Sequence, residues 1–535
     1  NEVNKIGKLS YIIQEKISVF LNRKCKFLDN LKIGNILSFS IFQTIFILIY
    51  KQSLLNKLNT NNIKQKIICV GNPEPAKHSR IDLYFDRFDN IFSILAKNSD
   101  NQLIKNYEHF LDPLSQKKKK FEVENIPITK IEKIFSIIDN SLSSFFFKIF
   151  RYVPITNLFF KRKIYIYGYN EHIADLFFSI LKKKYNIQFL QKPHKNHLKI
   201  NNDNFYNKHN YKKEIKNIIE QEMFEQNINV KNFDNSISIF INRLLLLINK
   251  IDFYEDQIKD YYLSVIKNIK NNEIILANGF YQSEDKILYH FIKKNNNKVI
   301  SFDHGVSIGM DKIRSSYVDK YSGTIGDVGV YSNDKACNSI KKFFPDRKVI
   351  VAGQIDRYKS LFNIKKFFLK FYYSIPFKKK VIFIVIGPQY NNTFFSPYRE
   401  RDRKVVKINK RLVTKICNEK KNCQIILKLY PGARYYNEYN YGDLGKFNNL
   451  KIIRDKDFRW LRYMADMIVT HCCDSTIGQI NNINAKSYFY SFSDRPINFQ
   501  EYLLDQNDFE GLKNLKIIKK GLFNKINFSE VLKEF

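Results

Sequence analysis

A strand, a sharp turn and a helix follow one another between residues 163 and 184, and this unit constrains the fold more than any other feature. Residues 163–167 (KIYIY) are apolar and rich in β-forming residues, and Gly168 permits a sharp turn. Asn170 is suited to cap a helix that runs to about residue 184, after which residues 186–191 predict the next strand. A helix that joins two parallel strands is the building block of a doubly wound sheet.

The same alternation of strands and helices recurs in both halves of the chain. In the first half, apolar runs predict strands at 273–279, 298–305, 328–334 and 348–356, and helical patterns occur at 212–226, 235–270 and 282–294. In the second half, strands are predicted at 378–390, 423–432, 450–455, 467–476 and 485–490, and helices at 402–419, 457–465 and 476–483. We therefore predict an α/β protein with two doubly wound, Rossmann-like domains that face a cleft.

The chain has 535 residues, which is too long for one hydrophobic core. Residues 1–60 have apolar residues at helical spacing and predict an extra helical segment at the N-terminus. We expect an N-terminal domain at 61–345, which begins with a strand at 66–75, and a C-terminal domain at 346–500. A short helical tail is expected at 501–535.

The formal net charge of +37 would suit a nucleic acid or an anionic membrane surface. Lysine is over-used along the whole length, however, and the sequence shows no RNA-binding signature and no zinc-finger spacing. A nucleic-acid partner is therefore not expected. The seven cysteines form no CxxC pair, which argues against a disulfide framework or a zinc site and fits a reducing compartment. We expect a cytoplasmic protein, either free or peripheral on the inner membrane face.

Residues 36–50 form the most apolar stretch, and no signal peptide is recognised. The stretch is shorter than the roughly 20 apolar residues that a spanning helix needs. A buried helix is therefore expected. A helix that lies on a membrane face, flanked by Lys32 and Lys51, is the alternative.

Three predicted strand ends carry residues suited to chemistry. The first is Asp303-His304-Gly305, which follows an apolar strand. The imidazole titrates near neutral pH and suits general-base work, and Gly305 permits a close backbone approach to a ligand. A histidine that only caps the strand end is the alternative.

The second strand end is the sequence LKLYPGAR, residues 427–434. Lys428 and Arg434 flank the turn that contains Pro431 and could hold a diphosphate. An ordinary Pro-Gly turn is the alternative.

The third strand end is VTHCCDSTIGQI, residues 469–480. Here His471 ends a strand, and Asp474, Ser475 and Thr476 open a helix. The hydroxyls and the exposed N–H groups of a helix start can bind phosphate, although simple capping of the helix is the alternative.

Taken together, the three motifs resemble GT-B-type transferases of bacterial surface polysaccharide, over about residues 298–500. This group includes the CDP-glycerol glycerophosphotransferase-like and the capsule-synthesis glycosyltransferases. Its members carry a QHG-like motif, then a KxHP motif, then a serine pair at a helix start with an acidic residue a few positions later. The matching positions are His304, Gly305, Lys428, Pro431, Ser475 and Thr476, and Asp466 lies at an aspartate position that precedes the serine pair.

The chain departs from this pattern at three positions. Tyr430 stands in place of the second histidine, Gln479 in place of the acidic residue, and Asp303 in place of the glutamine before His304. In the family, the second histidine contacts donor phosphate and the acidic residue holds the ribose. The resemblance therefore leaves open an altered donor site or a loss of activity.

The resemblance implies a GT-B-like glycosyltransferase of capsule or lipopolysaccharide synthesis, with a nucleotide-activated sugar as donor and a glycan or lipid-linked acceptor. His304 would be the base, oriented by Asp303 or another carboxylate of the cleft. The donor phosphates would lie against Lys428, Pro431, Arg434, Ser475, Thr476 and Gln479, and further cleft residues would be Gly305, Gln354, Asp356, Arg357, Gly387, Pro388, Gln389, His471 and Asp474.

The one D-x-D triplet, residues 455–457, is not part of the three motifs, and neither a metal nor a cofactor beyond the co-substrate is expected. A polyol-phosphate transferase and a non-catalytic nucleotide- or carbohydrate-binding protein remain alternatives on the same fold. An epimerase is disfavoured because its expected carboxylate set is not found. The donor, the acceptor, the stereochemical outcome and the oligomeric state are not predicted.

Overall fold

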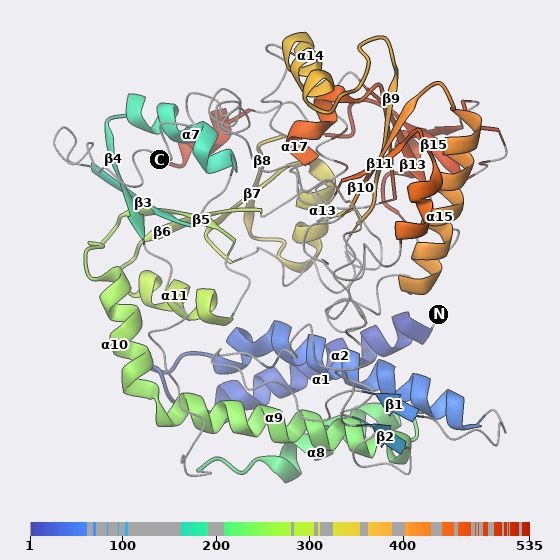
Figure 1. Cartoon of the computed structure of the whole chain (residues 1–535). Helices are drawn as coiled ribbons and strands as arrows, with labels where there is room; N and C mark the ends of the chain where they lie inside the picture. Colours follow the sequence, from blue (N-terminus) through green and yellow to red (C-terminus); the bar gives the residue numbers. More distant parts are fainter. Residues whose placement is uncertain are drawn as a thin grey trace.

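Most of the helices and strands predicted from the sequence are present in the computed structural model. The described residues are 2–60, 68–70, 83, 95, 102–104, 162–168, 171–190, 208–279, 283–303, 309–310, 325–353, 362–387, 402–429, 441–453, 458–471, 477, 480, 485–490, 497–505, 508–510, 512, 514–523 and 527–535. They form a helical layer, two large sheets with their covering helices, and a small two-stranded sheet (Figure 1).

The first large sheet has six strands, all parallel, in the order β4-β3-β5-β6-β7-β8. The strands are β3 (Arg162–Tyr167), β4 (Tyr185–Leu190), β5 (Ile274–Asn278), β6 (Lys298–Phe302), β7 (Val328–Tyr331) and β8 (Lys348–Val351), and the helices between them include α7 (Glu171–Lys182), α11 (Ser283–Lys294) and α13 (Asp334–Phe343). Gly168 has a φ of 78° directly after β3, as the predicted turn requires. The strand order reverses beside β3, so this sheet is doubly wound.

The second large sheet has seven strands in the order β11-β10-β9-β12-β13-β15-β14. Its strands are β9 (Val381–Val385), β10 (Gln424–Lys428), β11 (Leu450–Ile453), β12 (Met467–Thr470), β13 (Lys486–Tyr490), β14 (Leu503–Asp505) and β15 (Leu515–Ile518), and its helices are α14 (Phe362–Tyr372), α15 (Asp402–Glu419), α17 (Phe458–Leu461) and the 3-10 turns η4 (Gly442–Lys446), η5 (Arg462–Met464) and η6 (Gln500–Tyr502). The first five strands in this order are parallel, and β15 pairs antiparallel with both β13 and β14. The two doubly wound domains predicted from the sequence are therefore present.

Two of the predicted domain boundaries differ from those in the structure. Strand β8 pairs with β7, so residues 348–351 belong to the first domain rather than to a domain that begins at 346. Strands β14 and β15 extend the second sheet, so the second domain continues beyond residue 500, and residues 501–535 are not simply a helical tail. Both short strands escaped prediction because neither shows a long apolar run or a clear alternation.

The predicted strand at 66–75 is present in part, but in another place. Strand β1 (Ile68–Val70) pairs in parallel with β2 (Gln102–Ile104) in a separate two-stranded sheet. It is therefore not part of the six-stranded sheet of the first domain.

The predicted N-terminal helices are part of a larger helical layer (Figure 1). Helices α1 (Glu2–Lys24) and α2 (Ile33–Thr60) pack with α8 (Lys212–Glu225), α9 (Asp234–Phe253) and the turn η2 (Val230–Phe233). Helix α10 (Glu255–Ile266) packs on α9 in the same layer. Gly34 permits the close approach of α1 and α2, because a Cβ atom there would lie 2.1 Å from the carbonyl oxygen of Ser18. One apolar cluster runs from this layer to the lower face of the first sheet.

Helix α2 contains the apolar stretch 36–50. Among the described residues, the segment Ile33–Lys57 is one helix that is long and apolar enough to cross a membrane, by length and composition alone. Within its most apolar window, 78% of the residues are buried inside the protein. This burial is the expected behaviour of a core helix.

The C-terminal helix α19 (Ser529–Lys533) leaves the second domain and packs on the first. Val531 is buried in the core beside β3 and β4, and the hydroxyl of Tyr185 donates to the carbonyl oxygen of Phe535 at 2.6 Å. The carboxylate of Glu534 forms ion pairs with Lys298 (2.9 Å) and Lys348 (2.5 Å). The end of the chain therefore fastens the two domains together.

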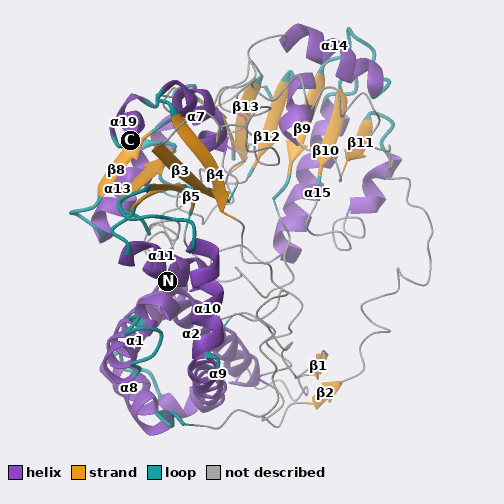
Figure 2. Cartoon of the chain, turned by 90° about the vertical axis from the view of Figure 1, so that its left-hand side faces the viewer, coloured by secondary structure: helices purple, strands orange, loops and turns teal. Residues whose placement is uncertain are grey.

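Figure 2 shows the sheet that holds β3, β4 and β5 beside the sheet that holds β9, β12 and β13. The two domains also meet in the segment after strand β6. Met310 lies in the core of the second domain, and its carbonyl oxygen accepts from the backbone N–H of Asn498 at 3.0 Å. The side-chain amide of Asn498 donates to the carbonyl oxygen of Gly309 at 2.9 Å. An ion pair joins Lys335 of α13 to Glu501. The carboxyl edge of the first sheet therefore lies against the second domain.

Candidate functional site

The carboxyl edge of the second sheet has its topological switch point between β9 and β12. Strand order turns back there, and doubly wound sheets bind their ligands at such points. Three strand ends are held in register. The hydroxyl of Thr470 donates to the carbonyl oxygen of Val385 at 3.1 Å, and the N–H of Ile386 donates to the carbonyl oxygen of Lys428 at 3.2 Å. Gly387 lies two residues after the end of β9, and His471 directly follows β12.

A buried amide lies beside His471. Asn409 of α15 is fully buried, and its Nδ2 donates to the hydroxyl of Tyr441 at 3.0 Å and lies 3.5 Å from Nε2 of His471. Its Oδ1 has no hydrogen-bond partner within the described part of the chain. An unsatisfied buried amide oxygen is costly, and such groups gather where a ligand or a water supplies the missing bond. Asn409, Tyr441 and His471 are therefore the best-defined candidate ligand contacts of this edge.

Lys428, a predicted phosphate ligand, ends strand β10 at the same edge. Its side chain is only 3% exposed, and Nζ donates to the carbonyl oxygen of Leu429 at 2.5 Å. A ligand phosphate would have to reach an ammonium group that already contacts the main chain.

Lys428 and His471 lie on opposite faces of the sheet. Successive strand residues alternate between faces. Ile426 and Ile468 belong to one core cluster, which places Lys428 and Thr470 on that face, whereas Leu427 and Val469 belong to the other cluster, the one packed on α15. His471 follows the second series and reaches Asn409 there. The structure therefore brings His471 and Lys428 to one edge but not into one cluster.

In the first domain, Asp303 directly follows β6. It is buried, and its backbone N–H donates to the carbonyl oxygen of Val330 at 2.9 Å. Burial, together with the carboxylates of Asp334 and Asp303, raises the pKa of the Cys337 thiol to about 12. Cys337 is therefore protonated at neutral pH and does not act as a nucleophile. Asp303 lies at the carboxyl edge of the first sheet, where the sequence predicts it.

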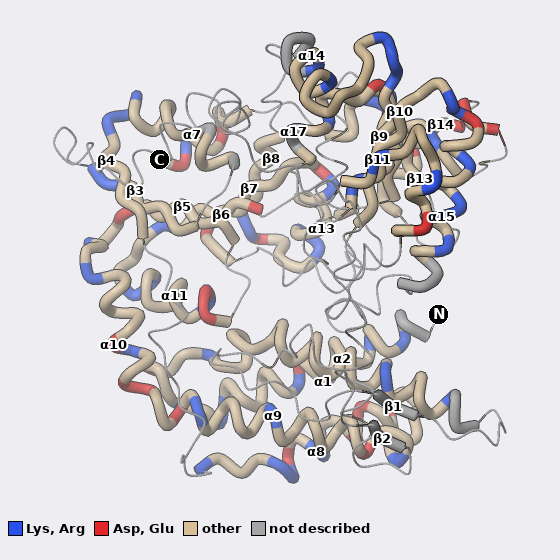
Figure 3. The backbone as a smooth tube through the Cα atoms, viewed as in Figure 1, with Lys and Arg blue, Asp and Glu red and all other residues tan. Residues whose placement is uncertain are grey.

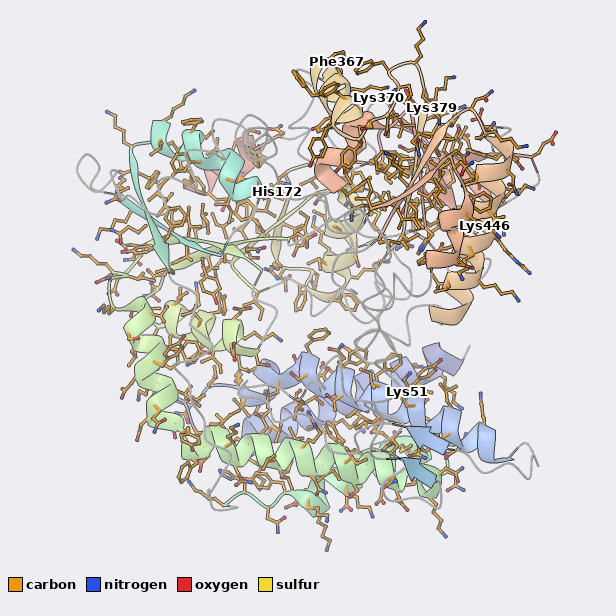
Figure 4. The ribbon with its side chains drawn as sticks, in the orientation of Figure 1. Lys51, His172, Phe367, Lys370, Lys379 and Lys446 are labelled. Atoms are coloured by element: carbon orange, nitrogen blue, oxygen red, sulfur yellow. The ribbon has the colours of Figure 1, made fainter. Side chains whose placement is uncertain are left out.

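Two residues near Asp303 were not singled out from the sequence. Asn333 follows β7 and caps α13, with Oδ1 accepting from the N–H of Ala336 at 2.8 Å, while its buried Nδ2 finds no partner among the described residues. His172 opens α7, and its Nε2 donates to the carbonyl oxygen of Gly353 at 2.9 Å (Figure 4). In sequence Asn333 looks like any residue that caps a helix, so only its burial in the structure identifies it as a candidate site residue.

Asp466, which occupies the family's aspartate position, lies at the opposite, amino edge of the second sheet. Its carboxylate accepts from the backbone N–H of Val381 at 2.8 Å and from Lys366 at 2.6 Å. These contacts fasten α14 to the start of β9. The residue acts as a structural link within the domain, away from the switch point.

The remaining predicted site residues lie outside the described residues. They are His304, Gly305, Gln354, Asp356, Arg357, Pro388, Gln389, Tyr430, Pro431, Arg434, Asp474, Ser475, Thr476 and Gln479. Each follows a described strand in sequence: His304 follows β6, Gln354 follows β8, Pro431 follows β10 and Ser475 follows β12. Within the described part of the chain, no group of three or more histidine, cysteine or acidic side chains is arranged to hold a metal.

The fold and the edge residues define a two-domain, doubly wound α/β protein. No protein-family description matches the sequence, and no curated protein matches it. Among solved structures, UDP-N-acetylglucosamine 2-epimerase from Rickettsia bellii is similar, with 13% sequence identity and a TM-score of 0.35. The similarity covers 61% of this chain and 78% of that protein. The fold assignment therefore rests on the strand order of this chain itself.

Proposed function

We propose that the protein is a nucleotide-sugar-dependent glycosyltransferase of capsule or lipopolysaccharide synthesis, acting on a glycan or lipid-linked acceptor. The observation that carries this proposal is the switch point of the second sheet, where the buried Asn409 and Tyr441 lie with the half-buried His471. The motifs that resemble surface-polysaccharide transferases fall on strand ends of the two sheets, which is where such folds bind ligands.

The donor is assigned to the second domain. Asn409 supplies an amide oxygen for a ribose hydroxyl or a base N–H, and His471 adds a polar ring on the same face. Lys428, Arg434, Ser475 and Thr476 follow or end β10 and β12 and offer cationic and hydroxyl groups for the diphosphate.

The acceptor is assigned to the first domain. His304, next to Asp303 at the end of β6, takes the proton from the acceptor hydroxyl. The acceptor oxygen then bonds to the anomeric carbon, the bond from that carbon to the diphosphate oxygen breaks, and the nucleoside diphosphate leaves. Contacts to the leaving phosphates stabilise the charge that develops there.

The test is a thermal-shift screen of the full chain against CMP, CDP, UDP and GDP. Because a ligand at about 100 times its Kd adds about 2.7 kcal/mol to the free energy of unfolding, one nucleotide should raise the Tm clearly. Lys428→Met should abolish this shift. Lys370→Met is the matched control, because Lys370 is also a buried lysine that donates to main-chain carbonyl oxygens, but at the amino edge.

His304→Ala should keep the nucleotide shift and lose sugar transfer. Turnover of CDP-glycerol in place of a nucleotide sugar would identify a polyol-phosphate transferase. A shift with no turnover of either donor class would leave a binding protein. No shift with any nucleotide would contradict the proposal.

A further inference from the structure

Helix α14 and the turn after it expose four phenylalanines on the second domain, and Figure 4 labels one of them, Phe367. Phe371 is 71% exposed, Phe367 51%, Phe377 48% and Phe368 44%. Large aromatic side chains that gather in one exposed patch mark an interaction surface more often than chance exposure does. We call these four residues, with Lys378 and Lys380, the Phe–Lys patch.

The patch has a fixed conformation. The rings of Phe367 and Phe377 stack with centroids 4.4 Å apart and planes 4° apart. The buried Lys370 donates to the carbonyl oxygens of Phe377 (3.0 Å) and Lys379 (2.7 Å) and so holds the turn against the helix. The exposure of the phenylalanines is therefore built into the domain and does not come from a frayed helix end.

The charge of the patch has one sign. Residues 362–380 contain six lysines and no carboxylate. Lys366 is paired with Asp466, whereas Lys378 and Lys380 are exposed beside Phe377. Figure 3 shows lysine at α14 and in the segment that leads to β9. Water-exposed aromatic rings flanked by lysines complement a lipid interface with anionic headgroups.

We propose that the Phe–Lys patch docks on an anionic lipid bilayer, with the phenylalanine rings in the interface and the lysines at the headgroup phosphates. A protein partner could also bury the apolar rings, but the excess of lysine favours binding to a surface with a high density of negative charge. The patch lies at the amino edge of the second sheet, because residue 380 directly precedes β9. Docking therefore leaves the carboxyl edge free, and it does not depend on the proposed transfer reaction.

The experiment is co-sedimentation of the full chain with vesicles, either of phosphatidylcholine alone or of equal parts phosphatidylcholine and phosphatidylglycerol, at low and high salt. The test variants are Phe371→Ser and the double variant Lys378→Gln with Lys380→Gln. The controls are Phe224→Ser, which alters a phenylalanine that is 80% exposed on α8, and Lys213→Gln on the same helix. Figure 1 shows α8 at the far end of the molecule from α14.

We expect binding to the anionic vesicles that weakens with salt. Each lysine near an anionic surface strengthens binding about fivefold, so the double variant should bind about 25-fold more weakly. Loss of one inserted phenylalanine should weaken binding about tenfold or more, while both controls should bind like the wild type. All four variants alter exposed side chains, and a thermal melt checks that they fold.

Three results would overturn the proposal. One is no binding of the wild type to anionic vesicles, and another is equal binding by the wild type and both patch variants. The third is a wild-type dimer in sedimentation velocity without lipid that Phe371→Ser converts to a monomer, since the patch would then join two copies of the chain.

Discussion

Two buried lysines, one in each domain, are held in different ways. Lys286 of α11 lies between the first sheet and the helical layer, and its Nζ is 3.4 Å from the hydroxyl of Ser38. Lys370 of α14 donates to two main-chain carbonyl oxygens at 3.0 and 2.7 Å. Burial lowers the pKa of both ammonium groups, for Lys286 to about 8.

The difference shows what a buried charge requires. Desolvation disfavours the ammonium in both places, and only close acceptors offset it. Lys370 has two such acceptors and fastens a turn. Lys286 has a long contact to a hydroxyl and lies beside Asp285, whose carboxylate already accepts from Tyr167 at 2.7 Å. Removal of Lys370 would therefore leave two carbonyl oxygens without their donor, whereas removal of Lys286 would take away a desolvated charge and leave only one hydroxyl without its donor.

The largest expected effect is that of Lys286→Met. Unfolded chains keep the lysine proton up to pH about 10.5, but the folded protein releases it near pH 8, so stability rises with pH between these values. Below pH 8 the variant should be more stable than the wild type by up to about 3 kcal/mol. This gain should fade as the pH rises to 10.5. Urea unfolding over this range measures the difference, with the exposed Lys267→Met as control, and a gain that does not change with pH would contradict the assignment.

The second expected effect has the opposite sign. Lys370→Met leaves the carbonyl oxygens of Phe377 and Lys379 without their donor, so the second domain should lose about 2 kcal/mol of unfolding free energy. Urea unfolding at pH 7 measures it, and Lys378→Met, at an exposed lysine, should change little. If Lys370→Met stabilised the protein as Lys286→Met does, the contrast between the two lysines would fail.

The smallest expected effect concerns a buried carboxylate held by ion pairs. Burial raises the pKa of Glu534, but the hydrogen bonds and charges of Lys348 and Lys298 outweigh it and leave this pKa below its ordinary value. Glu534→Gln should cost about 1 kcal/mol at pH 7, because both lysines reach water. The cost should disappear as the pH falls from about 4.5 through the lower folded pKa. Unfolding midpoints at pH 7 and at acid pH measure this, and Lys533→Met, on the exposed side of α19, is the control.

Sequence reasoning succeeded where buried strands form continuous apolar runs. Residues 381–385 (VIFIV) are buried without exception, so pattern and burial agree there. It failed at β14 and β15, three and four residues long, because such short edge strands depend on pairing with β13 rather than on their own pattern. The predicted boundary of the first domain also lay before β8, because the sequence of that strand does not show which sheet it joins.

The candidate site could be predicted only in part. Strand ends are visible in sequence, and they led to Asp303, Lys428 and His471. The face on which a side chain lies and its burial are not visible, so the separation of Lys428 from His471 was missed. Asn409 is an ordinary helical asparagine in sequence, and only the approach of Tyr441 and His471 gives it a role. Asp466 matched a family motif, but its contacts lie at the amino edge of the second sheet, away from the candidate site.

The return of the chain to the first domain has a mechanical consequence. The polypeptide leaves that domain after Gly353 and comes back at Asn527, whose N–H donates to the carbonyl oxygen of Ala352 at 2.9 Å. Exit and re-entry thus meet at one point. A rotation of one domain about this point would change the distance between the carboxyl edge of the first sheet and the second domain. Such a rotation would have to break the contacts of Asn498 and Lys335 and withdraw Met310 from the core of the second domain.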